Sequence, residues 1–278
     1  MYKYISILLL LFIPTIINAQ YYYNDVVLTN NINALNKVLK TQKVSKLVVT
    51  SLDFDNEPID NFLCEQRVEK NAKQVITTTG SPLAGETHLY SFYNNANQLI
   101  RSVDSNPTIV VQNTFTYSSN NIQNTTNISY EVGTKEKATE NHNWIITNNK
   151  YEKLVVIKNT YDTITVLLIC DSITTLPIQE VSYVKGKEKE RYYYYYDKQN
   201  RLTDIVRYNP YKRKLLPYVT YDYTTDNSIS KKTQYVNGTN DYTMWLYQYN
   251  ANGLKTEEVC YLKGNIFRGK LRYAYTYD

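Results

Sequence analysis

The sequence predicts an all-β protein built from antiparallel β-hairpins that repeat along the chain. Tyrosine supplies 30 of the 278 residues. In the C-terminal third, aromatic and polar residues alternate with a period of two, which is typical of strands with one covered face. Charged residues make up 21% of the chain and strand-forming residue types are abundant, which excludes global disorder.

Four tyrosines, each standing before a polar turn, define the repeat at separations of 27, 26 and 28 residues: Tyr196, Tyr223, Tyr249 and Tyr277. A second tyrosine follows each of the first three after twelve residues: Tyr208, Tyr235 and Tyr261. Such self-similarity at a fixed period indicates one supersecondary unit used several times.

Each unit reads as a hairpin with turn chemistry in its middle. Trp245, Tyr247 and Tyr249 share one face of a strand by alternation. Asn200 and Asn227 follow their tyrosines by four residues and tolerate a left-handed backbone. In the third unit Leu254 comes one residue early relative to the first two, which predicts a β-bulge in that return strand.

Weaker copies of the unit lie upstream, around Tyr93 and Tyr117. We therefore expect residues 88–278 to form a single curved meander sheet, with the clearest units in residues 190–278. Its aromatic face should be covered, either by the sheet coiling on itself or by the N-terminal region, because monomers rarely expose large apolar patches.

The first 19 residues read as a signal peptide. Lys3 is followed by an apolar run over residues 5–17, and Ala19 offers a cleavage site. We expect an exported protein that is periplasmic, at the cell surface of the envelope or secreted, with no transmembrane segment after cleavage. The first cysteine is Cys64, so a lipoprotein anchor is not expected.

Residues 20–87 lack the repeat and are expected to form a small N-terminal element. Ile32, Leu35 and Leu39 have helical spacing within residues 31–43, and residues 46–54 read as a strand. The polar stretch at residues 133–143 is the best candidate for an internal boundary loop.

The repeat resembles the units of YD-repeat (RHS-type) proteins, especially small secreted bacterial members of uncharacterised function. The residues that carry the resemblance best are Tyr196, Asp197, Asn200, Arg201 and Leu202. Tyr249, Gly253 and Leu254 match partially. The resemblance implies a β-hairpin repeat sheet and transfers no catalytic residues.

The residues offer few candidates for catalysis. His88 and His142 are isolated in polar contexts, which predicts solvated loop histidines. Four carboxylates lie together in a predicted loop: Asp53, Asp55, Glu57 and Asp60. They are expected to be solvated; the alternatives are a Ca²⁺ site or the acid pair of a hydrolase.

The three cysteines are widely spaced, at Cys64, Cys170 and Cys260. Three buried thiols are expected, and the alternative is one long-range disulfide with a free thiol. The basic stretches at residues 185–191 and 211–214 lie at predicted loops, and the formal net charge is only +5. Nucleic acid is therefore not expected as a partner of this exported chain.

We therefore expect a non-catalytic structural or interaction module without cofactor or metal, whose partner is a glycan or another envelope protein. The first alternative is glycan binding through stacking on the aromatic face, by Tyr194, Tyr196, Tyr221, Tyr223, Trp245, Tyr247, Tyr249, Tyr273 and Tyr275. The second alternative is a carboxylate-dependent hydrolase.

Overall fold

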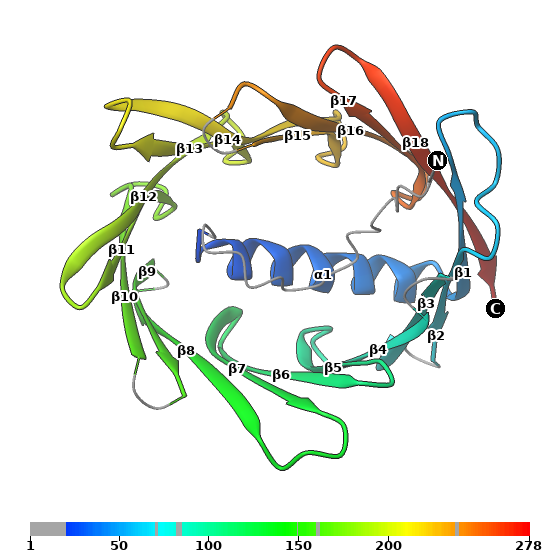
Figure 1. Cartoon of the computed structure of the whole chain (residues 1–278), viewed down its shortest axis with the longest axis horizontal. Helices are drawn as coiled ribbons and strands as arrows, with labels where there is room; N and C mark the ends of the chain where they lie inside the picture. Colours follow the sequence, from blue (N-terminus) through cyan, green and yellow to red (C-terminus); the bar gives the residue numbers. More distant parts are fainter. Residues whose placement is uncertain (1–20, 70–71, 82–84, 149, 160–161, 237–238) are drawn as a thin grey trace.

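The computed structural model describes residues 21–69, 72–81, 85–148, 150–159, 162–236 and 239–278, which form one helix and one closed ring of 18 antiparallel strands (Figure 1). The first nine strands are β1 (Val44–Leu52), β2 (Leu63–Val68), β3 (Gln74–Ser81), β4 (Gly85–Tyr93), β5 (Leu99–Ser105), β6 (Ile109–Ser118), β7 (Asn121–Glu131), β8 (Lys137–Thr147) and β9 (Lys150–Lys158). The others are β10 (Asp162–Cys170), β11 (Pro177–Val184), β12 (Lys187–Tyr196), β13 (Leu202–Asn209), β14 (Lys214–Tyr223), β15 (Ile229–Tyr235), β16 (Tyr242–Tyr249), β17 (Lys255–Leu262) and β18 (Ile266–Tyr277).

The sheet is a meander that closes on itself. Each strand pairs with the next in sequence, and β18 also pairs with β1, from Val44 opposite Tyr277 to Leu52 opposite Lys270. The prediction of all-β antiparallel hairpins is confirmed. The expected open, curved sheet is wrong, because the first and last strands satisfy each other's backbone groups and leave neither as an edge.

The hairpin units share one turn geometry. The pairing register shifts at Tyr196, Tyr223 and Tyr249, so each return strand carries a bulge. Four residues after these tyrosines, Asn200, Asn227 and Gly253 have φ of 62°, 66° and 74°. The left-handed turn is thus confirmed at both asparagines, whereas the bulge belongs to all three units and not to the third alone.

The residue after the tyrosine holds the turn. Asp197 Oδ1 accepts hydrogen bonds from the backbone N–H groups of Gln199 (2.9 Å) and Arg201 (3.0 Å). Asn250 Oδ1 accepts the same two bonds in its own turn, both at 3.0 Å. A Tyr-Asp or Tyr-Asn pair therefore combines a strand residue with an Asx-type turn.

The tyrosine hydroxyls join each unit to the one before it. Tyr223 donates to the carbonyl oxygen of Leu202 (2.7 Å). The same bond recurs from Tyr117 to Leu99 (2.8 Å), Tyr196 to Pro177 (2.8 Å), Tyr249 to Ile229 (2.9 Å) and Tyr275 to Lys255 (2.7 Å). In the last unit Tyr275 makes this bond, and the tyrosine that the spacing predicts, Tyr277, is 45% exposed.

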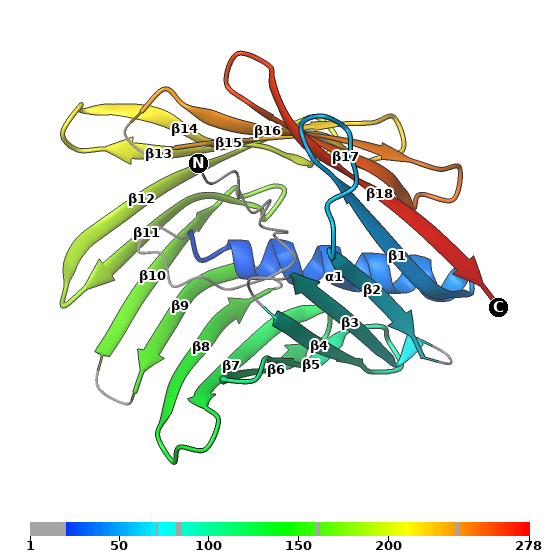
Figure 2. The ribbon, with the colours of Figure 1, turned by 45° about the vertical axis from the view of Figure 1, so that its right-hand side comes forward.

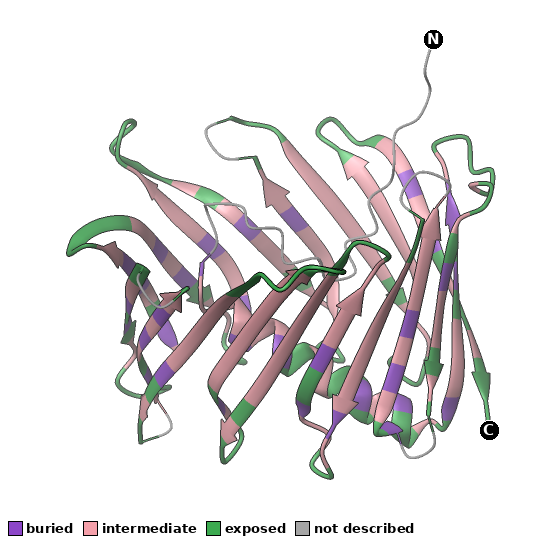
Figure 3. Cartoon of the chain, turned by 60° about the horizontal axis from the view of Figure 1, so that its bottom comes forward, coloured by how far each residue is buried: buried purple, intermediate pink, exposed green. Residues whose placement is uncertain are grey.

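A helix, α1 (Asn24–Thr41), lies inside the ring, across one end of the barrel (Figure 2, Figure 3). Its 18 residues span about 27 Å at 1.5 Å per residue. Val26 packs in a buried cluster with Leu154 and Val166, and Leu39 packs with Leu254 at the other end of the helix. The helix begins earlier than predicted, and Leu35, expected on its apolar face, is 47% exposed.

One further expectation differs from the structure. The stretch at residues 133–143 is not an internal boundary, because β8 begins at Lys137 and continues through it. The residues 20–87, as far as they are described, supply α1 and β1 to β3 of the same sheet. The predicted signal peptide, residues 1–19, lies outside the described residues.

We expect Tyr223→Phe to lower the free energy of unfolding by about 1 kcal/mol, because it deletes one hydroxyl bond to a backbone carbonyl and keeps the ring. Urea denaturation measures this loss. Tyr195→Phe is the matched control, since Tyr195 is 47% exposed on the neighbouring hairpin. Equal losses in the two variants would contradict the role of the hydroxyl in joining the units.

Candidate functional site

A buried carboxylate holds the start of α1. Glu180 on β11 is 1% exposed and points into the barrel. Its Oε1 accepts a hydrogen bond from the backbone N–H of Tyr22 (2.7 Å), and its Oε2 accepts from the N–H of Tyr23 (2.8 Å) and the hydroxyl of Tyr194 (2.7 Å). The amide groups at a helix start lack intrahelical partners and attract negative charge, so Glu180 fixes this end of α1 to the wall.

A second contact ties the first turn of α1 to β8. His142 Nδ1 lies 2.8 Å from Asp25 Oδ2 of the helix, and its Nε2 lies 2.6 Å from Glu140 Oε1. Lys158 Nζ lies 3.0 Å from the other oxygen of Glu140. We call Glu180, Asp25, His142, Glu140 and Lys158 the helix-anchoring cluster.

Burial and hydrogen bonding compete in setting the charges of this cluster. Burial raises the pKa of Glu180 to about 7, against the effect of its three donors. For His142, burial alone would lower the pKa, but the bonds to Asp25 and Glu140 outweigh it and raise the pKa to about 9. Burial likewise opposes the bonds from His142 and Lys158, which lower the pKa of Glu140 to about 2.

The arrangement makes His142 a structural cation. Both ring nitrogens are held by carboxylates, so the imidazolium has no free lone pair with which to act as a general base. The prediction of a solvated loop histidine is wrong for His142, whose side chain is 14% exposed on β8. His88 lies on β4, 38% exposed, and its Nε2 is 3.2 Å from Glu86 Oε1.

The nine predicted stacking rings line the inner face of the wall. Tyr194 is 2% exposed, and Tyr221 packs against the same buried cluster. Four of the nine donate their hydroxyls to backbone carbonyls: Tyr196, Tyr223, Tyr249 and Tyr275. These six rings join and fill the wall.

The other three rings, Trp245, Tyr247 and Tyr273, are half-buried beside interior cations. Lys255 Nζ lies 4.5 Å from the ring centre of Tyr247 and 5.4 Å from that of Tyr273. Glu258 accepts hydrogen bonds from Lys255 (2.9 Å) and from the Tyr273 hydroxyl (3.1 Å). Lys232 Nζ lies 5.3 Å from the Trp245 ring, and burial lowers the pKa of Lys232.

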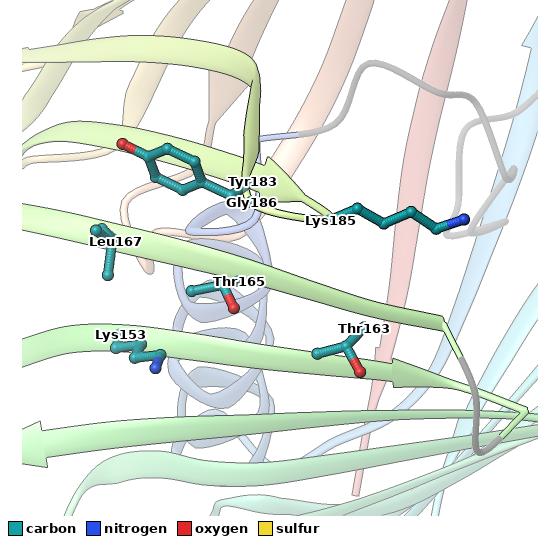
Figure 4. Close-up of a pocket in the computed structure, with 7 residues that line it drawn as sticks. All are labelled: Lys153, Thr163, Thr165, Leu167, Tyr183, Lys185 and Gly186. Atoms are coloured by element: carbon teal, nitrogen blue, oxygen red, sulfur yellow. The ribbon is translucent and has the colours of Figure 1, made fainter.

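A cavity of about 530 Å³ lies on the outer face, over β9, β10 and β11. Figure 4 shows its lining side chains on the face of the sheet opposite α1. We call it the outer cavity; it is lined by Lys153, Thr163, Thr165, Leu167, Tyr183, Lys185 and Gly186. It therefore combines an aromatic ring, two threonine hydroxyls and two lysine cations.

The clustered carboxylates after β1 and the three cysteines are the remaining candidates from the sequence. Asp53 Oδ1 accepts hydrogen bonds from the N–H groups of Asp55 (2.8 Å) and Glu57 (3.0 Å), which shapes the exposed loop after β1. Within the described part of the chain, no group of three or more His, Cys, Asp or Glu residues is placed to hold a metal. All three cysteines are free thiols: Cys64 is buried, and Cys170 and Cys260 are half-buried.

The helix-anchoring cluster cannot be predicted from a sequence motif. Its residues come from α1, β8, β9 and β11, so no short spacing joins them. One signal was available: Glu180 is the single charge in the strand sequence PIQEVSYV. A lone carboxylate in an otherwise uncharged strand indicates a buried group with specific partners.

No helix among the described residues has the length and apolar character needed to cross a membrane. No protein-family model matches the chain, and no curated protein matches it.

Solved structures give distant similarities. A porin-like protein from Bacteroides uniformis superposes with a TM-score of 0.40 at 10% identity, over 84% of this chain and 98% of that one. A TcdB2-TccC3-TEV structure gives a TM-score of 0.32 at 9% identity, over 82% of this chain and 16% of that one. The Photorhabdus luminescens Tc holotoxin pore gives 0.31 at 10% identity, over 86% of this chain and 17% of that one. Similarities this distant do not indicate a function.

We expect Glu180→Gln to lower the free energy of unfolding by about 1–3 kcal/mol, because an amide has one acceptor oxygen and leaves a buried donor unpaired. Hydrogen exchange should become faster in the first turn of α1. Glu131→Gln, at an exposed glutamate, is the control. Unchanged stability and unchanged exchange in Glu180→Gln would show that the carboxylate does not hold the helix.

The charged His142 should stabilise the fold in a defined pH range. Its folded-state pKa of about 9 lies above its ordinary value of 6.5, so the stabilisation is full below pH 6.5 and is lost as the pH rises to 9. The difference in unfolding free energy between the natural protein and His142→Gln should therefore shrink from pH 6 to pH 9.5. Urea denaturation across this range measures it, and a constant difference would contradict the assignment.

Proposed function

We propose that the chain is an exported, non-catalytic repeat protein of the YD-like kind that serves as an interaction module of the cell envelope. The observation that carries the proposal is the use of the repeated tyrosines. Five of their hydroxyls bond the backbone of the preceding unit. The repeated tyrosines thus stabilise the wall of the barrel. A stable wall can present its outer surface to a binding partner.

The charged groups support the same proposal. His142 has both nitrogens occupied by carboxylates, and Asp53 caps a turn. Glu190 and Arg207 form a further interior ion pair, and Glu190 Oε2 accepts from Arg207 Nε at 2.7 Å. Groups engaged in this way stabilise the barrel and are not arranged as a nucleophile beside a base.

Glycan binding by the inner face is the second candidate. It is favoured by Trp245, Tyr247 and Tyr273, the three predicted stacking residues that lie half-buried on the inner face and are not among those that bond a backbone carbonyl of a neighbouring unit in the described part of the chain. Lysine lies over all three rings, so a sugar would have to displace Lys232 or Lys255.

The test uses the chain expressed with its own leader in a bacterial host. The intact mass of the purified protein should correspond to residues 20–278. It should sediment saturably with the insoluble cell-envelope fraction, and the glycans recovered should be unchanged in length. Failure to sediment with any envelope fraction, or the appearance of shortened glycans, would contradict an envelope interaction module. Periodate and protease treatment of the envelope fraction separate a glycan partner from a protein partner.

A further inference from the structure

We propose that the outer cavity binds an acidic glycan. The inference rests on the proposed function in one respect: it identifies a surface and a ligand class for the interaction module. It concerns the outer face of β9 to β11, which carries none of the nine rings predicted to stack on sugars.

The outward position of the cavity follows from strand alternation. Ile164, Val166 and Leu168 of β10 face inward, where they pack in the cluster that contains Val26 of α1. The residues between them and beside them therefore face outward: Thr163, Thr165 and Leu167. The lining groups stand on neighbouring paired strands, which fixes their mutual geometry.

The pairing register gives the arrangement of the lining residues. Tyr183 lies opposite Thr165, and Lys153 lies opposite Leu167. Lys185 follows Val184, the partner of Ile164, and so stands beside Thr163. The backbone of Tyr183 is thus opposite the middle of the lined stretch, its ring extends toward Leu167 and Lys153, and Lys185 lies at the other end (Figure 4).

The charge of the cavity is positive. Neither Lys153 nor Lys185 forms an ion pair within the part of the chain that the structure describes. The nearest carboxylate in register, Glu188 opposite Tyr183, is neutralised by Arg191 at 2.7 Å. The lining contains no acidic residue, so the ligand that complements it is an anion.

The spacing of the cations indicates an extended ligand. Leu167 and Thr163, the neighbours of the two lysines, are four residues apart on β10, which corresponds to about 13 Å. The two lysine side chains, as they lie, occupy opposite ends of the lined stretch (Figure 4). The cavity suits a chain that carries separate negative groups.

The groups between the lysines favour a sugar over a peptide. The half-buried Tyr183 offers a ring face of the kind that packs against the apolar face of a sugar, and Leu167 adds apolar surface. Thr163 and Thr165 add hydroxyls that donate and accept hydrogen bonds. Because β9, β10 and β11 are all paired on both sides, no strand edge is free there to receive an extended peptide.

The experiment measures binding of oligogalacturonate and of heparin oligomers by titration calorimetry. Lys153→Gln and Lys185→Gln should each raise the Kd by about tenfold, as expected for loss of a charge-assisted bond. Tyr183→Ala should abolish binding, and Tyr183→Phe should restore it. The matched controls, Lys198→Gln and Tyr195→Ala, alter an exposed lysine and an exposed tyrosine outside the cavity and should leave the Kd unchanged.

The ligand class is tested by two further probes. Methyl-esterified oligogalacturonate keeps the sugar and removes the charge, and poly-glutamate keeps the charge and removes the sugar; neither should bind. Equal binding of poly-glutamate would overturn the glycan assignment. Absence of binding to both acidic glycans would overturn the site. An unchanged Kd in Lys153→Gln, Lys185→Gln and Tyr183→Ala would overturn it as well.

The envelope sedimentation experiment separates this inference from the proposed function. If the double variant Lys153→Gln/Lys185→Gln still sediments with the envelope fraction as the natural protein does, the site is wrong and the interaction module stands. If the natural protein does not sediment, the proposed function itself fails. Thermal unfolding of each variant confirms that the barrel is intact.

Discussion

The width of the barrel is the constraint on which the structure depends. A closed sheet of eight strands can be filled by its own side chains, but a ring of 18 strands encloses far more space. Here α1 crosses one end of that space and supplies Val26 and Leu39 to two of the buried clusters. The helix can do this only if its polar ends are bonded inside the barrel. Glu180 and His142 meet that need at its start, and Asn36 Nδ2 donates to the carbonyl of Ala72 near its end.

The repeated tyrosines hold neighbouring hairpin units together. Aromatic pairs across strands contribute only about 0.2–1 kcal/mol each, which is too little to keep so long a meander in register. Five tyrosine hydroxyls each add a bond from one unit to the backbone of the unit before it. The following Asp or Asn fixes the turn. In the units of Tyr196 and Tyr249, two consecutive residues therefore fix both the local turn and the contact with the preceding unit.

Much of this could be predicted from local sequence, because strand alternation and turn chemistry are local properties. The hairpins around Tyr196, Tyr223 and Tyr249 follow directly from them, as do the left-handed turns at Asn200 and Asn227. Closure could not be predicted, because the pairing of Val44 with Tyr277 joins residues more than 200 positions apart. The predicted helix is too short because residues 24–30 have weak helical propensity, and Glu180, distant in sequence, holds the backbone N–H groups of Tyr22 and Tyr23 just before them. The burial of His142 cannot be predicted for the same reason, since its partner Asp25 lies on another element.

The pairing of β18 with β1 has a consequence for the integrity of the chain. Because β1 and β18 are far apart in sequence, the ring cannot be completed until β18 is available, and non-local pairing of this kind slows folding. A chain shortened by one strand would leave β1 and β17 as two unpaired borders on the same molecule. Each border would present free backbone N–H and C=O groups that can pair with a border of another copy, so loss of the last dozen residues would favour association between copies.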